Sequence, residues 1–228
     1  MKRPYELLIF DWDGTLMDSE AHIVACMQMA MTELGLEVLP RAAICNVIGL
    51  GMREAVQTLF PARPDDAFVS RFTAAYRQHY FAPDAPQALF DGTRKTLRRL
   101  RGEGYRLAVA TGKGRHGLDR ALAESGLAAL FDAHRCAEET ASKPDPTMLR
   151  EILEELEVAV ENAVMVGDTE YDLAMAGAIG MHAIGVSYGV HATERLWRHR
   201  PLTCLDCITE LPEFLRNPVH HGGMSGVG

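Results

Sequence analysis

The feature that most constrains the fold of this 228-residue chain is a set of short apolar runs, several of which end in polar or glycine-rich turns. The runs lie at residues 7–10, 105–110, 163–166 and 182–186. Runs of this length are typical of strands buried on both faces, as in parallel sheets. Helix-like segments alternate with the runs after residue 90, which predicts an α/β fold with a doubly wound parallel sheet. Ligands of such sheets bind beyond the carboxyl ends of the strands, so the turns after the runs are candidate sites.

Two carboxylates, Asp11 and Asp13, follow the first run at alternate positions, and Gly14 comes next. The period of two along a strand directs both side chains the same way if the strand continues to them, and glycine lets the chain turn sharply away. Like charges this close repel one another unless a cation lies between them or one takes a proton. Mg²⁺ prefers carboxylate oxygens and is commonly bound together with phosphate. Alone, the pattern fits a strand ending in an acidic turn equally well.

Two later stretches carry polar groups of a related kind. Thr111, Gly112 and Lys113 follow the second run, where a hydroxyl and free backbone N–H groups form a turn suited to a phosphate. Lys143 precedes a helical stretch that opens at Pro144, although a cation is mildly unfavourable at a helix start. That mismatch favours a functional role for Lys143, as a point charge beside carboxylates and phosphoryl oxygens.

The third run ends in another pair of carboxylates. Asp168 follows the run directly, and Asp172 lies one helical turn further, on the same face if residues 169–177 are helical. Two more carboxylates aimed at Asp11 and Asp13 would be destabilising without a cation. This is the strongest argument from the residues themselves for a bound Mg²⁺.

These four stretches, in this order and spacing, resemble the motifs of the haloacid dehalogenase superfamily, in the form used by its phosphatase branch. The matching elements are Asp-x-Asp-Gly-Thr at 11–15, Thr111, Lys143, and the pair Asp168 and Asp172. Three residues separate that last pair, which is shorter than the Gly-Asp-x₄-Asp form but is also used in the family. The resemblance covers about residues 5–215 and is strongest for the phosphoglycolate phosphatase and β-phosphoglucomutase group.

The resemblance implies Mg²⁺-dependent hydrolysis of a small phosphate monoester of the phosphoglycolate kind. In the family, the residue that matches Asp11 attacks the phosphoryl group and becomes an aspartyl-phosphate. The residue that matches Asp13 protonates the leaving alkoxide and then deprotonates the water that hydrolyses the intermediate. Thr111 and Lys143 match the residues that hold the phosphoryl oxygens.

The same resemblance implies the metal ligands. It assigns Mg²⁺ to Asp11, Asp13 and Asp168, with Asp13 contributing its backbone carbonyl oxygen. It gives Asp172 the task of orienting the metal shell. The family's sheet places the first and fourth motif strands side by side, which would bring Asp11, Asp13 and Asp168 together.

Residues 16–90 carry helical patterns and no clear strand, which predicts an all-helical insertion after the first strand. Helices are expected at 19–34, 40–47, 52–60 and 66–80, with Ser19 as N-cap and Gly35 as stop of the first. The resemblance identifies the insertion as a cap that closes over the site. The predicted domains are an α/β core of residues 1–15 and 91–216, a helical cap of residues 16–90, and a disordered tail of residues 217–228.

A loop between two predicted cap helices, residues 48–53, has two glycines around one leucine and ends at Arg53. Arg53 can reach an anionic group, or it can be a solvated side chain at a helix start. In the resembling group this cap loop helps to choose the substrate. The candidate substrate-binding residues are therefore Arg53, Thr111, Gly112, Lys113 and Lys143.

Composition narrows the function classes. The net charge of −8 argues against a nucleic-acid binder, and the basic helix at 93–102 is interpreted as a solvated face because no aromatic residues interleave with it. No apolar run approaches the roughly 20 residues that span a bilayer, and the N-terminus has no signal-peptide pattern. The five cysteines, Cys204 and Cys207 among them, form no disulfide framework. We expect a cytoplasmic monomer or homodimer that acts on a small phosphorylated metabolite and binds neither nucleic acid nor membrane.

Alternatives stay open at this point. A phosphomutase would use the same residues and shield the intermediate from water, and a pyrophosphatase would differ in its substrate. The dehalogenase branch lacks the second aspartate of the first motif, so Asp13 counts against it. A phospho-acceptor regulatory module needs neither an acid/base residue nor a cap, so Asp13 and the insertion at 16–90 argue against that class. The phosphate ester itself is not identified by these residues.

Overall fold

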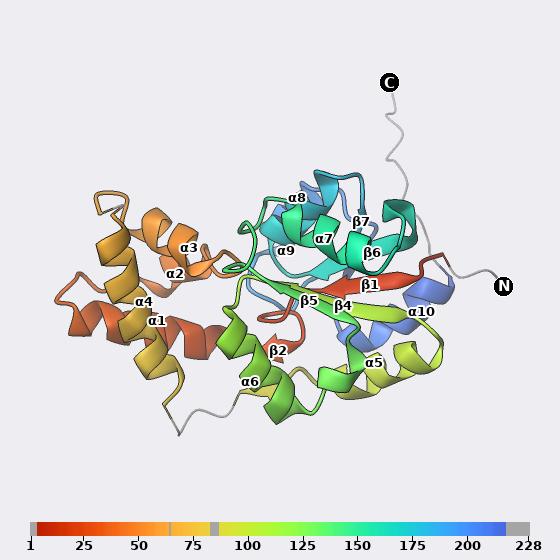
Figure 1. The fold of residues 1–228 in the computed structure, drawn as a ribbon, viewed down its shortest axis with the longest axis horizontal. Coiled ribbons are helices and arrows are strands. Elements are labelled where there is room, and N and C mark those ends of the chain that lie inside the picture. The colour runs from red at the N-terminus through yellow and green to blue at the C-terminus, as the bar shows by residue number, and fades with distance from the viewer. Residues whose placement is uncertain (1–3, 64, 83–86, 218–228) are drawn as a thin grey trace.

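The computed structural model describes residues 4–63, 65–82 and 87–217, and at its centre is one parallel sheet covered by helices (Figure 1). The strands are β1 Leu7–Phe10, β4 Arg106–Thr111, β5 Ala133–Cys136, β6 Ala163–Gly167, β7 His182–Val186 and β8 Cys204–Leu205. Their order is β5-β4-β1-β6-β7-β8, and every pair is parallel. The chain thus builds outward from β1 in both directions, and the predicted doubly wound α/β fold is confirmed.

The core helices cover both faces of this sheet. They are α5 Thr93–Gly102, α6 Arg115–Ser125, α7 Thr147–Glu155, α8 Glu170–Gly177, α9 Thr193–Trp197 and α10 Leu211–Arg216. Short 3₁₀ helices occur at Ala128–Leu130, Val160–Asn162 and Ile208–Glu210. Leu8 and Phe10 of β1 pack in the layer with α5, α6 and α10, whereas Leu7 and Ile9 pack in the layer with α7, α8 and α9. Because alternate side chains enter two different buried layers, the strand is apolar throughout.

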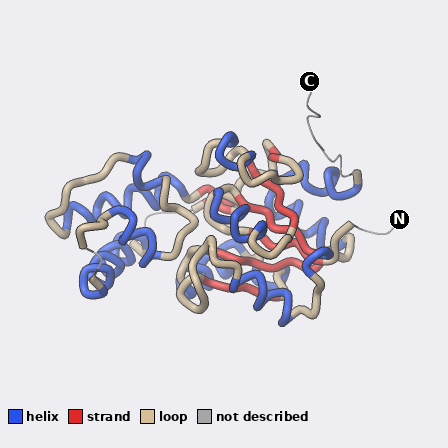
Figure 2. The backbone as a smooth tube through the Cα atoms, turned by 90° about the horizontal axis from the view of Figure 1, so that it is seen from above, coloured by secondary structure: helices blue, strands red, loops and turns tan. Residues whose placement is uncertain are grey.

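The inserted helices form a second unit at one side of the sheet (left in Figures 1 and 2). They are α1 Glu20–Glu33, α2 Arg41–Cys45, α3 Met52–Leu59 and α4 Asp66–Tyr80. They share a hydrophobic cluster of their own, which includes Met31, Ile44 and Phe72. Gly35 follows α1 at a φ of 64°, the left-handed region that glycine adopts easily. This unit, called the cap below, can therefore keep its own packing beside the core.

The prediction of no strand within residues 16–90 is wrong at both ends of the insertion. Met17–Asp18 (β2) and Ala88–Leu89 (β3) form a small antiparallel sheet. These strands lie where the chain leaves the core and where it returns, so the pairing holds the two crossings together. Strands of two residues are too short for a periodic pattern, and their pairing depends on tertiary context. The domain boundaries themselves stay predictions.

Some predicted element ends also move by a few residues. The helix predicted at 40–47 is α2 at Arg41–Cys45, and the run at 105–110 becomes β4 at Arg106–Thr111. Near the C-terminal end of the described residues, a 3₁₀ turn at Ile208–Glu210 leads directly into α10. The eleven residues 218–228, which make up nearly all of the predicted tail, lie outside the described residues.

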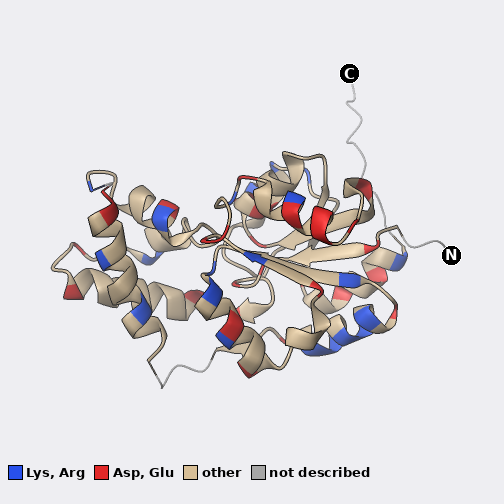
Figure 3. Ribbon diagram, viewed as in Figure 1, with Lys and Arg blue, Asp and Glu red and all other residues tan. Residues whose placement is uncertain are grey.

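The basic helix α5 faces outward, as Figure 3 shows along the lower edge of the core. Arg98 and Arg99 are exposed, whereas Leu97 and Leu100 are fully buried. The amphipathic pattern alone therefore accounts for the position of these arginines. Among the described residues, no helix is both long enough and apolar enough to cross a bilayer.

Candidate active site

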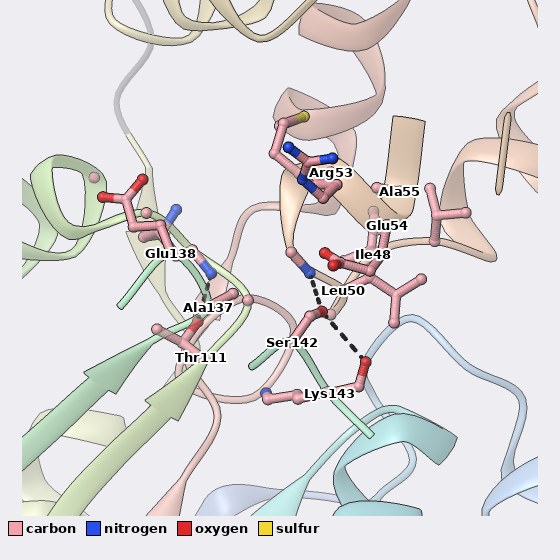
Figure 4. Close-up of a pocket in the computed structure, with 18 of the residues that line it drawn as sticks. Ile48, Leu50, Arg53, Glu54, Ala55, Thr111, Ala137, Glu138, Ser142 and Lys143 are labelled. Carbon is pink, nitrogen blue, oxygen red and sulfur yellow. Dashed lines mark hydrogen bonds between the residues drawn. The ribbon is translucent and has the colours of Figure 1, made fainter. Parts of the chain in front are cut away.

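The carboxyl ends of β1 and β4 face a cavity of about 730 Å³ that the cap and the core line together (Figure 4). These strands are neighbours in the sheet, so residues that follow them meet at one edge. Asp11 and Asp13 from the end of β1, Thr111 from β4 and Lys143 from the loop before α7 all line the cavity. Residues predicted from separate motifs are thus brought to one place.

The two carboxylate oxygens of Asp11 have different surroundings. Oδ1 accepts a hydrogen bond from Lys143 Nζ at 2.7 Å, whereas Oδ2 is buried without a hydrogen-bond partner among the described residues. Burial raises the pKa of Asp11 to about 7; Lys143 opposes this rise, and the like charges of Asp172 and Asp13 add to it. Because buried carboxylate oxygens are normally paired, the lone Oδ2 marks a position for a cation or a reacting atom.

Lys143 is a fully buried cation that links two carboxylates. Its Nζ lies 2.7 Å from Asp11 Oδ1 and 2.6 Å from Asp172 Oδ1. Burial by itself lowers the pKa of Lys143, but the two carboxylates together outweigh burial and raise it. The ammonium group therefore keeps its charge at neutral pH, where it can also attract phosphoryl oxygens.

Asp168 follows β6 and is held from two sides. Thr15 Oγ1 donates to Oδ1 at 2.8 Å, and the backbone N–H of Val190 donates to Oδ2 at 2.8 Å. Burial raises the pKa of Asp168 well above its ordinary value, and the neighbouring carboxylates add to the rise. Gly14, at a φ of +84°, passes so close that a Cβ atom there would lie 2.2 Å from Asp168 Oδ2. The turn after β1 therefore needs glycine at this position.

Asp172 lies in the first turn of α8, where it forms a capping box with Thr169. Its Oδ2 accepts hydrogen bonds from the backbone N–H of Thr169 at 3.0 Å and from the Thr169 hydroxyl at 2.7 Å. The other oxygen, Oδ1, faces Lys143. The helix start thus fixes the orientation of this carboxylate.

Oxygens of Asp11, Asp168 and Asp172 lie within 4.8 Å of one another, and all three residues are buried. Three carboxylates beside the single buried lysine leave an excess of negative charge, which a divalent cation would neutralise. The donor atoms are all oxygens, as Mg²⁺ prefers, and one member of the cluster, Asp11, has a buried oxygen without a hydrogen-bond partner. The residues therefore fit a Mg²⁺ site. The cluster contains Asp11 and Asp168 of the predicted ligands, together with Asp172 rather than the Asp13 side chain.

The carboxylate of Asp13 has different hydrogen-bond and ion-pair partners from that of Asp11. Ser19 Oγ donates to Oδ1 at 2.6 Å, and Lys113 Nζ lies 2.9 Å from Oδ2. Lys113 Nζ also donates to the hydroxyl of Tyr80, at the end of α4, at 2.6 Å. Burial by itself lowers the pKa of Lys113, but Asp13 and Tyr80 outweigh burial and raise it. A buried polar chain therefore connects Asp13 to the cap.

The turn after β4 touches the cap loop directly. Thr111 Oγ1 accepts a hydrogen bond from the backbone N–H of Lys113 at 3.2 Å. A Cβ atom on Gly112 would lie 2.5 Å from the backbone oxygens of Gly49 and Leu50, so only glycine permits this approach. Gly112 thus brings the cap loop close to Thr111.

Arg53 is the predicted substrate-binding residue that lies apart from the other predicted site residues. It lines the cavity, but its guanidinium NH1 pairs with Asp66 of α4 at 2.6 Å and its side chain is 51% exposed. In Figure 4 it lies across the cavity from Lys143. Among the described residues, Arg53 is therefore ion-paired with Asp66, and with neither the carboxylate cluster nor the contacts around Lys113.

Comparison with known proteins identifies the family. A family model described as haloacid dehalogenase-like hydrolase matches residues 8–186. The chain belongs to the haloacid dehalogenase-like hydrolases. It is 36% identical over 210 residues to the probable phosphatase IndB of Dickeya dadantii, covering 90% of this chain and 91% of that protein. It is 34% identical over 230 residues to a phosphoglycolate phosphatase of Rhodospirillum rubrum, covering 96% and 94%.

A solved structure agrees with this assignment. A putative haloacid dehalogenase-like hydrolase from Bacteroides fragilis superposes with a TM-score of 0.84 at 25% sequence identity, covering 91% of this chain and 99% of that one. The family predicted from the four motifs is thereby confirmed, and the chain is a hydrolase.

The site of this haloacid dehalogenase-like hydrolase also contains residues that sequence reasoning missed. Ser19 was expected to cap α1 and does occupy the N-cap position, but its hydroxyl donates to Asp13 and makes no cap hydrogen bond. Thr15 belongs to the first motif, yet its bond to Asp168 could not be predicted from its position. Tyr80 has no local signal at all, since it is an ordinary apolar-face residue of α4 until the cap folds against the core.

Proposed function

We propose that this hydrolase is a Mg²⁺-dependent phosphatase that acts on a small phosphate monoester through an aspartyl-phosphate on Asp11. The observation that carries the proposal is the pair of different oxygens on Asp11, one bound to Lys143 and one buried without a partner. The names of the relatives, a probable phosphatase and a phosphoglycolate phosphatase, support the same class of substrate.

In the first step, a lone pair of Asp11 Oδ2 forms a bond to phosphorus while the bond from phosphorus to the ester oxygen breaks. Asp13 gives a proton to the departing oxygen, which leaves as an alcohol. Lys143 and the Thr111 hydroxyl hold the phosphoryl oxygens and oppose the charge that develops on them. Each of these side chains lines the same cavity.

In the second step, the ionised Asp13 takes a proton from water, and the hydroxide oxygen attacks phosphorus. The bond between phosphorus and Asp11 breaks, which releases inorganic phosphate and restores the carboxylate. Asp13 is protonated again and can serve the next cycle. The Ser19 and Lys113 contacts hold the Asp13 carboxylate in a defined position throughout.

We propose that Asp11 and Asp168 hold Mg²⁺, with Asp172 orienting the shell and the Asp13 backbone carbonyl as a further ligand. When bound, the cation supplies positive charge that offsets the clustered carboxylates and the phosphoryl oxygens. The cytoplasmic location and the monomer or homodimer expected from the sequence belong to the same proposal. The phosphoglycolate-like ester stays an expectation of the family resemblance, which the charges lining the cavity put to the test.

The test is a phosphate-release screen over small phosphate esters, a sugar 1-phosphate and pyrophosphate, with and without Mg²⁺, for the parent and Asp11→Asn. We expect Mg²⁺-dependent release from at least one monoester and none from Asp11→Asn. Isomerisation of the sugar phosphate without release would instead identify a phosphomutase. No turnover of any compound by a folded, Mg²⁺-binding protein would overturn the enzyme proposal and favour a phospho-acceptor module.

A further inference from the structure

The cap side of the cavity is where the leaving group of a substrate would lie. Asp11 and Lys143 occupy the core side, so a phosphoryl group bound there directs its ester oxygen toward the cap. The cavity of about 730 Å³ is of the size that holds drug-sized ligands, about 300–1,000 Å³. The charges on the cap side therefore select what the leaving group can be.

Every lysine and arginine among the described residues that line this cavity already has a carboxylate partner. The ion pairs are 2.6–2.9 Å long: Lys143 with Asp11, Lys113 with Asp13, Arg53 with Asp66, and Arg77 with Glu138. A substrate carboxylate would have to displace one of these partners to gain a cation. His116 is the other group able to carry positive charge, and its ring packs edge-on against Phe81.

The carboxylates that line the cavity, unlike the lysines and arginines, are not all paired. Four of them have partners: Asp11, Asp13 and Glu138 in the ion pairs above, and Asp145, which accepts bonds from the N–H and hydroxyl of Thr147. Glu54 is the exception, because it has neither a hydrogen bond nor an ion pair with another described residue. The charge of Glu54 acts on the neighbouring Arg53 guanidinium, but no donor among the described residues bonds to its carboxylate. Glu54 therefore offers the cavity a negatively charged acceptor without a hydrogen-bond partner.

The position of Glu54 is set by the start of α3. Its Oε2 lies 2.7 Å from the point where a Cβ atom of Gly51 would stand, and Ser142 Oγ lies 3.1 Å from the same point. Figure 4 shows its carboxylate beside Leu50 and Ser142, in the part of the cavity wall where the cap loop meets the core. A glutamate in the first turn also stabilises a helix through its dipole, but that role needs no contact with the cavity.

We propose that the substrate's leaving group is a neutral or cationic alcohol that donates a hydrogen bond to Glu54, and not a hydroxy acid such as glycolate. This inference rests on the proposed phosphatase function and specifies its substrate class. A hydroxyl or ammonium group satisfies the free carboxylate, whereas a substrate carboxylate would be placed beside a like charge. On this proposal the chain would differ from its relatives named phosphoglycolate phosphatase in the leaving group that it accepts.

The test uses three esters with a two-carbon leaving group and different charge: 2-phosphoglycolate, 2-hydroxyethyl phosphate and 2-aminoethyl phosphate. For the parent we expect kcat/KM to be lowest for 2-phosphoglycolate, by about tenfold or more against the better of the other two. Glu54→Gln removes the charge at constant size, and the ratio between aminoethyl and glycolate esters should fall by about tenfold. Because this ratio is compared between the parent and Glu54→Gln, the difference in intrinsic reactivity between the two esters cancels.

Three further variants make the result specific. Glu37→Gln makes the same change at an exposed cap residue outside the cavity and should leave all three values unchanged. Arg53→Met and His116→Gln test the competing idea that a cation in the cavity receives a substrate carboxylate. A selective loss of 2-phosphoglycolate turnover in either variant would overturn the proposal.

Other outcomes would also show whether Glu54 selects the leaving group and whether the protein is a phosphatase. A parent that prefers 2-phosphoglycolate, or a Glu54→Gln variant that changes all three esters equally, would show that Glu54 does not select the leaving group. Where an ester is not turned over, its inhibition constant against p-nitrophenyl phosphate hydrolysis supplies the same ratio. A parent that hydrolyses neither p-nitrophenyl phosphate nor any ester would overturn the phosphatase proposal itself, which is a different result from lost selectivity.

Discussion

The two carboxylates that follow β1 are separated by one residue, yet different parts of the molecule hold them. Asp11 contacts Lys143 and lies in a cluster with Asp168 and Asp172, all from the core. Asp13 contacts Ser19 and Lys113. Lys113 in turn is held by Tyr80 of the cap, through a hydrogen bond of 2.6 Å and through a ring centroid 4.6 Å from its Nζ.

The cap can therefore influence the proposed acid/base residue, Asp13, without contacting the proposed nucleophile, Asp11. Burial raises the pKa of Tyr80, with help from the charge of Asp13, so its hydroxyl stays protonated and can donate to Gln87 while it accepts from Lys113. If the cap moves away, Lys113 loses a partner but Lys143 does not. We therefore expect substitutions around Asp11 and Asp13 to separate into two kinds.

The largest effects should come from the two carboxylates, and they should differ in kind. With p-nitrophenyl phosphate, Asp11→Asn should lower kcat by about 10⁴-fold or more, as lost nucleophiles do, with no initial burst of nitrophenol. Asp13→Asn should lower steady-state turnover by roughly 10²–10⁴-fold. It should keep a burst of about one equivalent per site, because this leaving group departs without a proton and only the second step fails. Stopped-flow absorbance measures both.

Asp91→Asn is the matched control, since Asp91 is exposed and lies outside the cavity. Its turnover should equal that of the parent. A burst from Asp11→Asn, or equal behaviour of the two site variants, would contradict the separate roles of nucleophile and acid/base residue.

Loss of the buried Lys143 charge should lower the free energy of unfolding. Lys143→Met leaves Asp11 and Asp172 as buried carboxylates without their shared lysine, and losing one partner of a buried ion pair costs about 3–5 kcal/mol. Urea unfolding without added metal measures the free energy of unfolding. Lys95→Met, at an exposed position of α5, should change it by less than about 0.5 kcal/mol. A loss below about 1 kcal/mol for Lys143→Met would mean that the buried charges rearrange.

The cap contact to Lys113 should have an intermediate effect. Tyr80→Phe removes the two hydrogen bonds of the hydroxyl, to Lys113 and Gln87, each worth about 0.5–1.5 kcal/mol. It should lower kcat on an alkyl phosphate by about three- to tenfold through displacement of Asp13. The nitrophenol burst should keep the parent's rate, because the first step with that ester does not need the acid. Tyr76→Phe is the control, since the Tyr76 ring packs against Tyr80 in the same helix. A slowed burst in Tyr80→Phe would break the proposed separation.

The smallest effect is expected at the exposed contact between cap and core. Arg77 of α4 pairs with Glu138 at 2.8 Å, with side chains 50% and 42% exposed. Such surface pairs contribute about 0.2–1 kcal/mol and weaken in salt. Arg77→Met should therefore change the free energy of unfolding by that amount and kcat by less than about twofold, measured at low and high salt. A larger loss of kcat would show that this pair, and not Tyr80, holds the cap in its working position.

Sequence patterns could indicate that residues of separate motifs meet, because three of the four motifs lie at or directly after the end of a strand. Asp11, Thr111 and Asp168 reach one edge of the sheet for the same reason, that the carboxyl ends of neighbouring parallel strands coincide. The cap contacts were not predictable in this way. Tyr80 lies on a helix whose pattern reports only which face is apolar, and the short pairing of β2 with β3 has no periodic signal.

Neighbours along the chain set where the strands end and which chemical groups follow them, so both can be predicted from local patterns. Which of these groups contact one another depends instead on how distant segments pack in the folded protein. Lys143 and Asp11 are 132 positions apart, and their contact depends on strand order and loop packing. The same packing joins Asp172 to the carboxylate cluster, places Asp13 beside Lys113, and leaves Glu54 facing the cavity. Local patterns cannot encode these choices, because each depends on the distance between segments that meet only in the folded chain.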